Sequence, residues 1–283
     1  SGSWGDPAVW DTYPNLPAFD GTEDAFVGAA ATSYGTTYTL DGDRHVNSLT
    51  LEGSFKTITA IGTPTTSRLI LASGNVTKTS TAYHEMGPPI YLGDGASAVT
   101  GVWSVAGNTL TLCANAKIHG GPGSLIRIQG AANLSLLTDN SATYAGDWSV
   151  EGGNVFLGND KALSGGTVAL GNNAKLFVDT TRTIANTIVC SGGDAKFENN
   201  NYQTLTLSGP ISGPGRIYPG KSNNYNWALK LTSPYISSTG GIDFNRTCAV
   251  VVCGTWTNCG DIAVRCSYGE TSLQGNGTIG MAS

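Results

Sequence analysis

Short runs of alternating apolar and polar residues recur along the chain at a nearly constant interval. Two series share it: residues 148–150, 168–170 and 188–190, each followed by residues 155–157, 176–178 and 195–197. Within each series the runs start 19 to 21 residues apart. Alternation with period two indicates half-buried strands, and a repeat of about 20 residues indicates a coil whose turns cover one another. The pattern predicts an all-β fold, a right-handed, single-stranded parallel β-helix (β-solenoid).

The repeat divides the chain into three parts. Residues 1–36 lack the pattern and are predicted to form a short N-terminal capping segment, because a first turn without a cap exposes unpaired backbone groups. Residues 37–283 are predicted to form the β-solenoid, with irregular turns over 37–146 and regular turns of about 20 residues over 147–283. Further strands are predicted at residues 49–51, 69–71, 90–92, 110–112, 126–128, 134–136, 205–207 and 229–231. The stretch 77–89 is predicted to leave the coil as a loop.

Composition agrees with a coil of short strands and tight corners. Glycine accounts for 39 of 283 residues, and charged residues make up 12% against about 25% in an ordinary soluble domain. The net charge is −5 and the lysines and arginines are scattered singly. A basic stripe is absent from the sequence, so we expect neither nucleic acid nor anionic lipid as a partner. The longest apolar run, 25–31, is too short to span a membrane.

The chain contains six cysteines, and four of them fall within the last 36 residues: Cys248, Cys253, Cys259 and Cys266. A zinc site usually contains a pair of cysteines two residues apart, which this spacing does not supply. We therefore predict that these four cysteines form disulfides between neighbouring turns, which implies an oxidising compartment. Cys190 shares its register with Val150 and Leu170 and is predicted to be buried.

The N-terminus carries neither the basic segment nor the apolar segment of a signal peptide. Two interpretations remain, a cytosolic protein or the mature form left after signal cleavage. The cysteines favour the second, so we predict an extracellular or cell-surface location.

Residues 143–168 resemble the autotransporter-associated β-strand repeat of exported bacterial proteins. The phrases at residues 205–209 and 273–280 are similar to two further parts of that repeat. The resemblance implies an exported or surface-located bacterial β-helix protein.

Three groups of residues invite a catalytic or metal-binding interpretation. His119 and the run from Arg127 to Gln129 look like fragments of a polygalacturonase site, but adjacent acidic pairs that could share acid and base roles do not occur. Residues 41–45 offer Asp41 and Asp43 to a calcium ion, although a polar turn is the better interpretation. His84 begins a zinc-protease motif that lacks its second histidine. A polysaccharide lyase or glycoside hydrolase is thus the less favoured interpretation.

Aromatic residues among amides suggest binding of sugars. Tyr225, Trp227 and Tyr235 are candidate glycan contacts, since aromatic rings stack on sugar rings. The competing prediction places Trp227 inside the coil, alternating with Leu229 and Leu231.

Taken together, these features predict a non-enzymatic, exported structural protein of the cell surface, extracellular matrix or a filament. The alternative is a surface adhesin or carbohydrate-binding β-helix. We expect no catalytic residues, cofactor or metal, and partners that are either further copies of the chain or surface glycans. The sequence ends directly after a repeat-like phrase. Either it was cut from a longer protein, or a second copy covers the last turn and the copies self-assemble head-to-tail.

Overall fold

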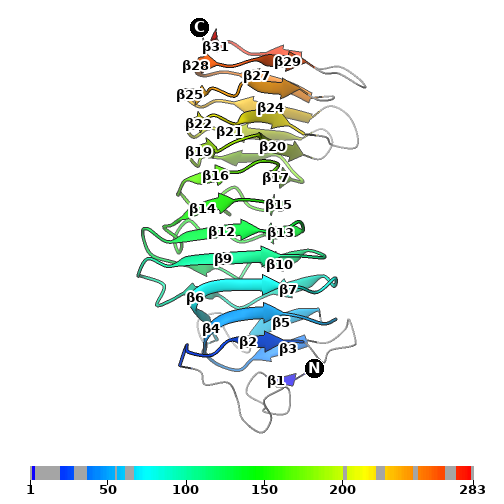
Figure 1. Ribbon diagram of the computed structural model, residues 1–283, viewed down its shortest axis with the longest axis vertical. Helices are drawn as coiled ribbons and strands as arrows, with labels where there is room; N and C mark the ends of the chain where they lie inside the picture. Colours follow the sequence, from blue (N-terminus) through cyan, green and yellow to red (C-terminus); the bar gives the residue numbers. More distant parts are fainter. Residues whose placement is uncertain are drawn as a thin grey trace. The chain divides into compact units, whose positions relative to one another are not determined.

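A computed structural model describes residues 2–3, 20–28, 37–54, 56–60, 67–199, 203–220, 227–244, 248–264 and 272–281. Every helix or strand assigned within these ranges is a strand. The strands pair in parallel with the equivalent strands one turn away (Figure 1). The predicted fold class, a parallel β-solenoid, is therefore confirmed. The chain divides into two compact units, Ser1–Asp147 and Trp148–Ser283.

The second unit winds around three faces. Its first face contains β14 (Asp147–Val150), β16 (Val168–Leu170), β19 (Ile188–Cys190), β22 (Ile211–Gly213), β25 (Tyr235–Ser238), β28 (Thr255–Cys259) and β31 (Thr278–Met281). Its second face contains β15 (Asn154–Leu157), β17 (Lys175–Val178), β20 (Asp194–Asn199), β23 (Arg216–Pro219), β26 (Ile242–Phe244) and β29 (Ile262–Val264). Its third face contains β18 (Arg182–Ile184), β21 (Thr204–Leu207), β24 (Trp227–Leu231), β27 (Cys248–Val252) and β30 (Ser272–Gln274).

The first two faces of this unit carry the two series of runs seen in the sequence. On the first face, Trp148 pairs with Val168, and Val168 pairs with Ile188, each step covering 20 residues. The third face was not recognised as a separate face from the sequence, although its strands at 205–207 and 229–231 were predicted. A complete turn therefore contains three strands separated by tight corners.

The first unit is also three-sided. Its first face contains β2 (Ala25–Val27), β9 (Thr100–Val105) and β12 (Leu125–Gln129), and its second face β1 (Gly2–Ser3), β3 (Thr37–Leu40), β5 (Thr57–Ala60), β7 (His84–Met86), β10 (Leu110–Leu112) and β13 (Asn133–Leu136). Its third face contains β8 (Ile90–Leu92) and β11 (Ile118–His119).

Two long strands of the first unit, β4 (Arg44–Leu51) and β6 (Leu69–Lys78), belong to two faces. Their first halves continue the third face, where β6 pairs with β8, and their second halves continue the first face, where β6 pairs with β9. Turns are longer here than in the second unit, since Leu49 pairs with Val76 and Val76 with Trp103, 27 residues apart in each case.

The prediction that residues 77–89 leave the coil was wrong. Strand β6 continues to Lys78, and β7 pairs in parallel with β5 and β10 on the second face. The sequence pattern was misleading because Lys78 and His84 are polar residues at inward positions, and both are fully buried. Of the predicted capping segment, β1 and β2 also pair in parallel, with β3 and β4.

Large aromatic side chains fill the interior, and their polar atoms are satisfied there. The indole N–H groups of Trp103, Trp148 and Trp256 donate to backbone carbonyls at 2.9, 3.0 and 3.1 Å. Since a buried N–H without an acceptor would be costly, these bonds allow the largest side chains to occupy the core. Cys190 is fully buried in register with Leu170, as predicted.

Glycine marks a corner where successive turns of the second unit approach most closely. A Cβ atom on Gly254 would lie 1.7 Å from the carbonyl oxygen of Ser233, a backbone atom one turn away. Gly165, in contrast, has open space around its Cα atom.

We expect Gly254→Ala to lower the free energy of unfolding by about 1–3 kcal/mol, because the added methyl group must push two turns apart. Gly165→Ala is the matched control in the same unit and should be neutral or stabilise by up to about 1 kcal/mol. Urea unfolding of both variants measures the difference. Equal stabilities would contradict the close approach at Gly254.

Lys78 places a cation inside the first unit. Its ammonium group donates to the carbonyl oxygens of Ser80 and Ala106, the latter at 3.1 Å. Burial disfavours the charged form and lowers the pKa of Lys78 from 10.5 to about 8.

This shift predicts a pH dependence of stability. Between about pH 8 and 10.5 the unfolded chain holds the proton of Lys78 more tightly than the folded chain, so the contribution of this site to stability rises with pH in that window. Lys78→Met lacks the titrating group, and the wild type should gain stability relative to the variant as the pH rises. Urea unfolding of both proteins across the window tests this, and a difference independent of pH would contradict it.

Candidate functional site

A row of four side chains runs along the outside of the third face of the first unit. In successive strands, His45 pairs with Ile70, Ile70 with Tyr91, and Tyr91 with His119. Their strand neighbours Val46, Leu71 and Leu92 are fully buried. Because side chains alternate along a strand, the four residues of the row point away from the core.

The loop of residues 93–99, which joins β8 to β9, forms one wall of a groove beside this row. The groove has a volume of about 570 Å³ and is lined by His45, Arg68, Ile70, Ala72, Tyr91, Gly93, Asp94, Ser97 and Val99. The loop leaves the third face at Gly93, whose N–H donates to the carbonyl of Leu71 at 2.8 Å. Its other end is held where the N–H of Leu125 donates to the carbonyl of Val99 at 3.0 Å.

Asp94 gives the loop its local shape. Its Oδ1 atom accepts hydrogen bonds from the backbone N–H groups of Ala96 and Ser97 at 2.9 and 2.7 Å, and its Oδ2 atom accepts one from the Ser97 hydroxyl at 2.9 Å. Such a turn is typical of aspartate in loops. These hydrogen bonds hold the pKa of Asp94 below its usual value, so the groove contains a carboxylate that stays ionised.

The aromatic ring of Tyr91 is held on the row by its neighbours. The His119 ring stacks on it with centroids 4.0 Å apart and planes 5° apart. The Arg68 guanidinium carbon lies 5.2 Å from the Tyr91 centroid, within reach of a cation–π interaction. The backbone of Gly95 also lies against Tyr91, since a Cβ atom there would be 2.7 Å from the ring. Tyr91 is therefore a fixed element of the groove.

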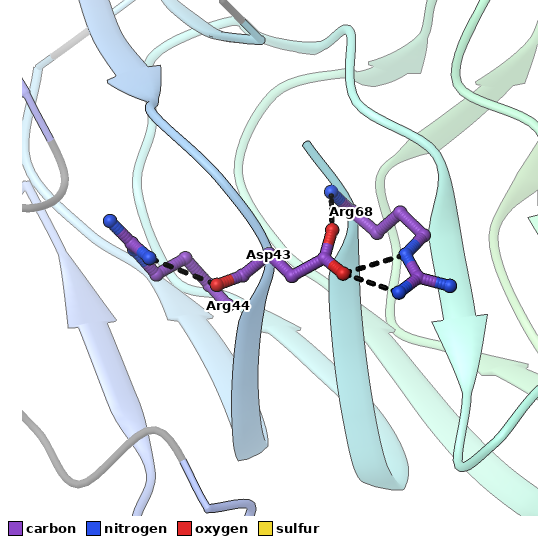
Figure 2. A network of polar contacts seen from close by, with 3 residues as sticks. All are labelled: Asp43, Arg44 and Arg68. Atoms are coloured by element: carbon purple, nitrogen blue, oxygen red, sulfur yellow. Dashed lines mark hydrogen bonds and ion pairs between the residues drawn. The ribbon is translucent and has the colours of Figure 1, made fainter. Parts of the chain in front are cut away.

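Arg68 is oriented by Asp43, as Figure 2 shows. The Asp43 carboxylate accepts from Nε of Arg68 at 2.9 Å, from Nη2, and from the backbone N–H of Arg68 at 2.9 Å. This fork geometry is the strong form of an arginine–carboxylate pair. It lowers the pKa of Asp43 and raises that of Arg68. One turn of the solenoid thereby positions a guanidinium on the next.

The residues that suggested a calcium site are part of this polar network. Asp43 binds Arg68, and Asp41 forms an ion pair with Arg44. Within the part of the chain that the structure describes, no group of three or more His, Cys, Asp or Glu residues could hold a metal ion. The arrangement is the polar turn that the sequence favoured.

The polygalacturonase-like fragments are not brought together. His119 belongs to the row on the third face, whereas Arg127 lies on β12, on the first face. The third histidine that raised a catalytic question, His84, is fully buried in the core.

The predicted glycan contacts have different outcomes. Trp227 is 2% exposed and alternates with the buried Leu229 and Leu231, so the expectation of a surface contact was wrong and the competing prediction of a core position is confirmed. Tyr235 is 74% exposed at the start of β25. Tyr225 lies outside the described residues.

The predicted disulfides are not seen among the cysteines that the structure describes. Cys253 and Cys259 have free thiols, one exposed and one buried, so neither is bridged. The side chain of Cys248 and all of Cys266 lie outside the described residues. Burial raises the pKa of the Cys190 thiol to about 12, which makes it unreactive at neutral pH.

Comparisons with known proteins do not place this chain in a family. No family model matches it, no curated protein matches it, and no solved structure matches it. The resemblance of residues 143–168 to the autotransporter-associated repeat stays a prediction. Among the described residues, no helix is long and apolar enough to cross a membrane.

His119 offers a spectroscopic test of the row. Burial, Lys117 and Arg68, in that order, lower the pKa of His119 below 6.5. We expect its imidazole to titrate below 6.5 in an NMR titration, and Lys117→Met to move the midpoint upward while the effect of burial persists. A wild-type midpoint at or above 6.5 would show that the ring is not held against Tyr91 as described.

Proposed function

We propose that the protein is a non-enzymatic structural scaffold in which charged side chains outside the coil join one turn to the next. In the second unit, Lys175 on β17 binds Glu198 on β20, with Nζ and Oε2 2.8 Å apart. Arg216 on β23 reaches Asp194 on β20 and Asp243 on β26, at 2.6 and 3.2 Å. One arginine thus connects three successive turns, and this observation carries the proposal.

The interior supports the same role. The turns stack apolar residues over apolar residues, as where Leu205, Leu229, Val250 and Leu273 follow one another on the third face of the second unit. In a solenoid each repeat contacts only its neighbours, so stability accumulates turn by turn. A coil stabilised in this way presents a regular lateral surface, which suits a protein that acts through form and stiffness.

The proposal places this scaffold outside the cell, at the surface, in the extracellular matrix or in a filament. Support comes from the resemblance of residues 143–168 to a repeat of exported proteins. The low share of charged residues, 12%, fits a coil built from short strands and corners.

The proposal includes self-assembly of the scaffold. We expect sedimentation coefficients to rise with protein concentration and electron microscopy of concentrated samples to show fibres. A single monomeric species at every concentration would contradict self-assembly.

The non-enzymatic part has its own test. Incubation with pectin, alginate and related polymers should leave them intact. Release of reducing or unsaturated ends would instead identify a polysaccharide hydrolase or lyase, and a boiled sample provides the control for contaminating sugars.

A further inference from the structure

We propose that the groove between the outer row of the first unit and the loop of residues 93–99 is a binding site for one sugar ring of an uncharged glycan. A scaffold role and a saccharide site are independent, because the turns stack without any contribution from the groove. The site also differs from the aromatic residues of the second unit that the sequence suggested.

The size and floor of the groove suit a sugar ring. Its volume of about 570 Å³ lies within the range of small-molecule sites, which are lined mainly by apolar groups with a few placed polar ones. Ile70, Ala72 and Val99 supply aliphatic carbon atoms to its lining. A pyranose ring presents a C–H surface to such carbons while its hydroxyl groups point outward around the rim.

The rim supplies both partners that a hydroxyl group needs. A guanidinium has five N–H donors, and the Arg68 side chain donates two of them to Asp43. A carboxylate has about four acceptor positions, and Asp94 uses three, for Ala96 N–H, Ser97 N–H and the Ser97 hydroxyl. A donor at Arg68 and an acceptor at Asp94 therefore line the same groove in fixed positions.

The charges favour an uncharged sugar over a uronic acid. The positive charge of Arg68 is compensated by the forked contact with Asp43, and Asp94 adds a negative charge to the groove. A carboxylate on the ligand would meet Asp94 without a free counter-charge from Arg68, and like charges at close range are unfavourable.

The arrangement of Tyr91 argues against a flat aromatic ligand. His119 stacks on the Tyr91 ring, and Arg68 lies within cation–π distance of it. With these two groups against it, Tyr91 contributes mainly the side of its ring to the groove. Aliphatic contacts and paired hydrogen bonds then provide the affinity, and a polyhydroxylated ring uses both.

The experiment titrates the full chain with defined oligosaccharides and follows backbone amide shifts by NMR and heat by calorimetry. Cellotetraose, xylotetraose and mannotetraose are the uncharged probes, and trigalacturonate is the anionic one. We expect at least one uncharged probe to bind, with the largest shifts at Ala72, Gly93 and Ser97. Trigalacturonate should bind more weakly.

Two variants test the groove itself. Ala72→Phe fills it and should weaken binding by about tenfold or more, and Asp94→Asn keeps an acceptor for the loop amides but loses the carboxylate, which should weaken binding about tenfold. Ala169→Phe makes the same change at an outward alanine of the second unit, and Tyr235→Ala removes its exposed tyrosine. Both controls should stay within about twofold of the wild type.

Several results would overturn the proposal. These are no binding of any uncharged probe, affinity unchanged by Ala72→Phe and Asp94→Asn, preference for trigalacturonate, or loss of binding in Tyr235→Ala. If Ala72→Phe does not fold, as judged by circular dichroism, Asp94→Asn and the position of the amide shifts decide the matter.

Discussion

In-register pairing between successive turns is the constraint on which the rest of this structure depends. Each inward side chain lies next to its equivalent one turn away, so Val150, Leu170 and Cys190 form a single buried column. A slip of one residue in any strand would turn its inward side chains to solvent. The indole hydrogen bonds, the glycine corners and the external ion pairs all require that this register be kept.

The sequence was sufficient for the fold and for most strands, because inward positions are mainly Val, Leu and Ile and outward positions mainly polar. It failed where a polar residue points inward, as at Lys78 and His84, since burial there depends on partners from other turns. The candidate site could not be predicted. Its row joins His45, Ile70, Tyr91 and His119, which are 25, 21 and 28 residues apart, an irregular spacing that no repeat reveals.

The two kinds of exterior in this protein differ in what holds their charges. On the second face of the second unit, Arg216 is held between carboxylates of neighbouring turns, so its charge serves the coil. In the groove of the first unit, Asp94 is held by backbone amides of its own loop and faces a space that nine residues line. Groups that are preorganised around a cavity in this way are positioned to meet a ligand.

The loop of residues 93–99 lies outside the ladders, and this has a consequence for how the protein can change. Its ends are anchored at Leu71 and Leu125, so the register of the strands on either side does not depend on how many residues lie between them. Because lengthening a surface loop costs little, insertions and deletions there can reshape the groove while the coil keeps its core. Binding preference and fold stability are thus separable traits, and the same solenoid can diversify its recognition without being rebuilt.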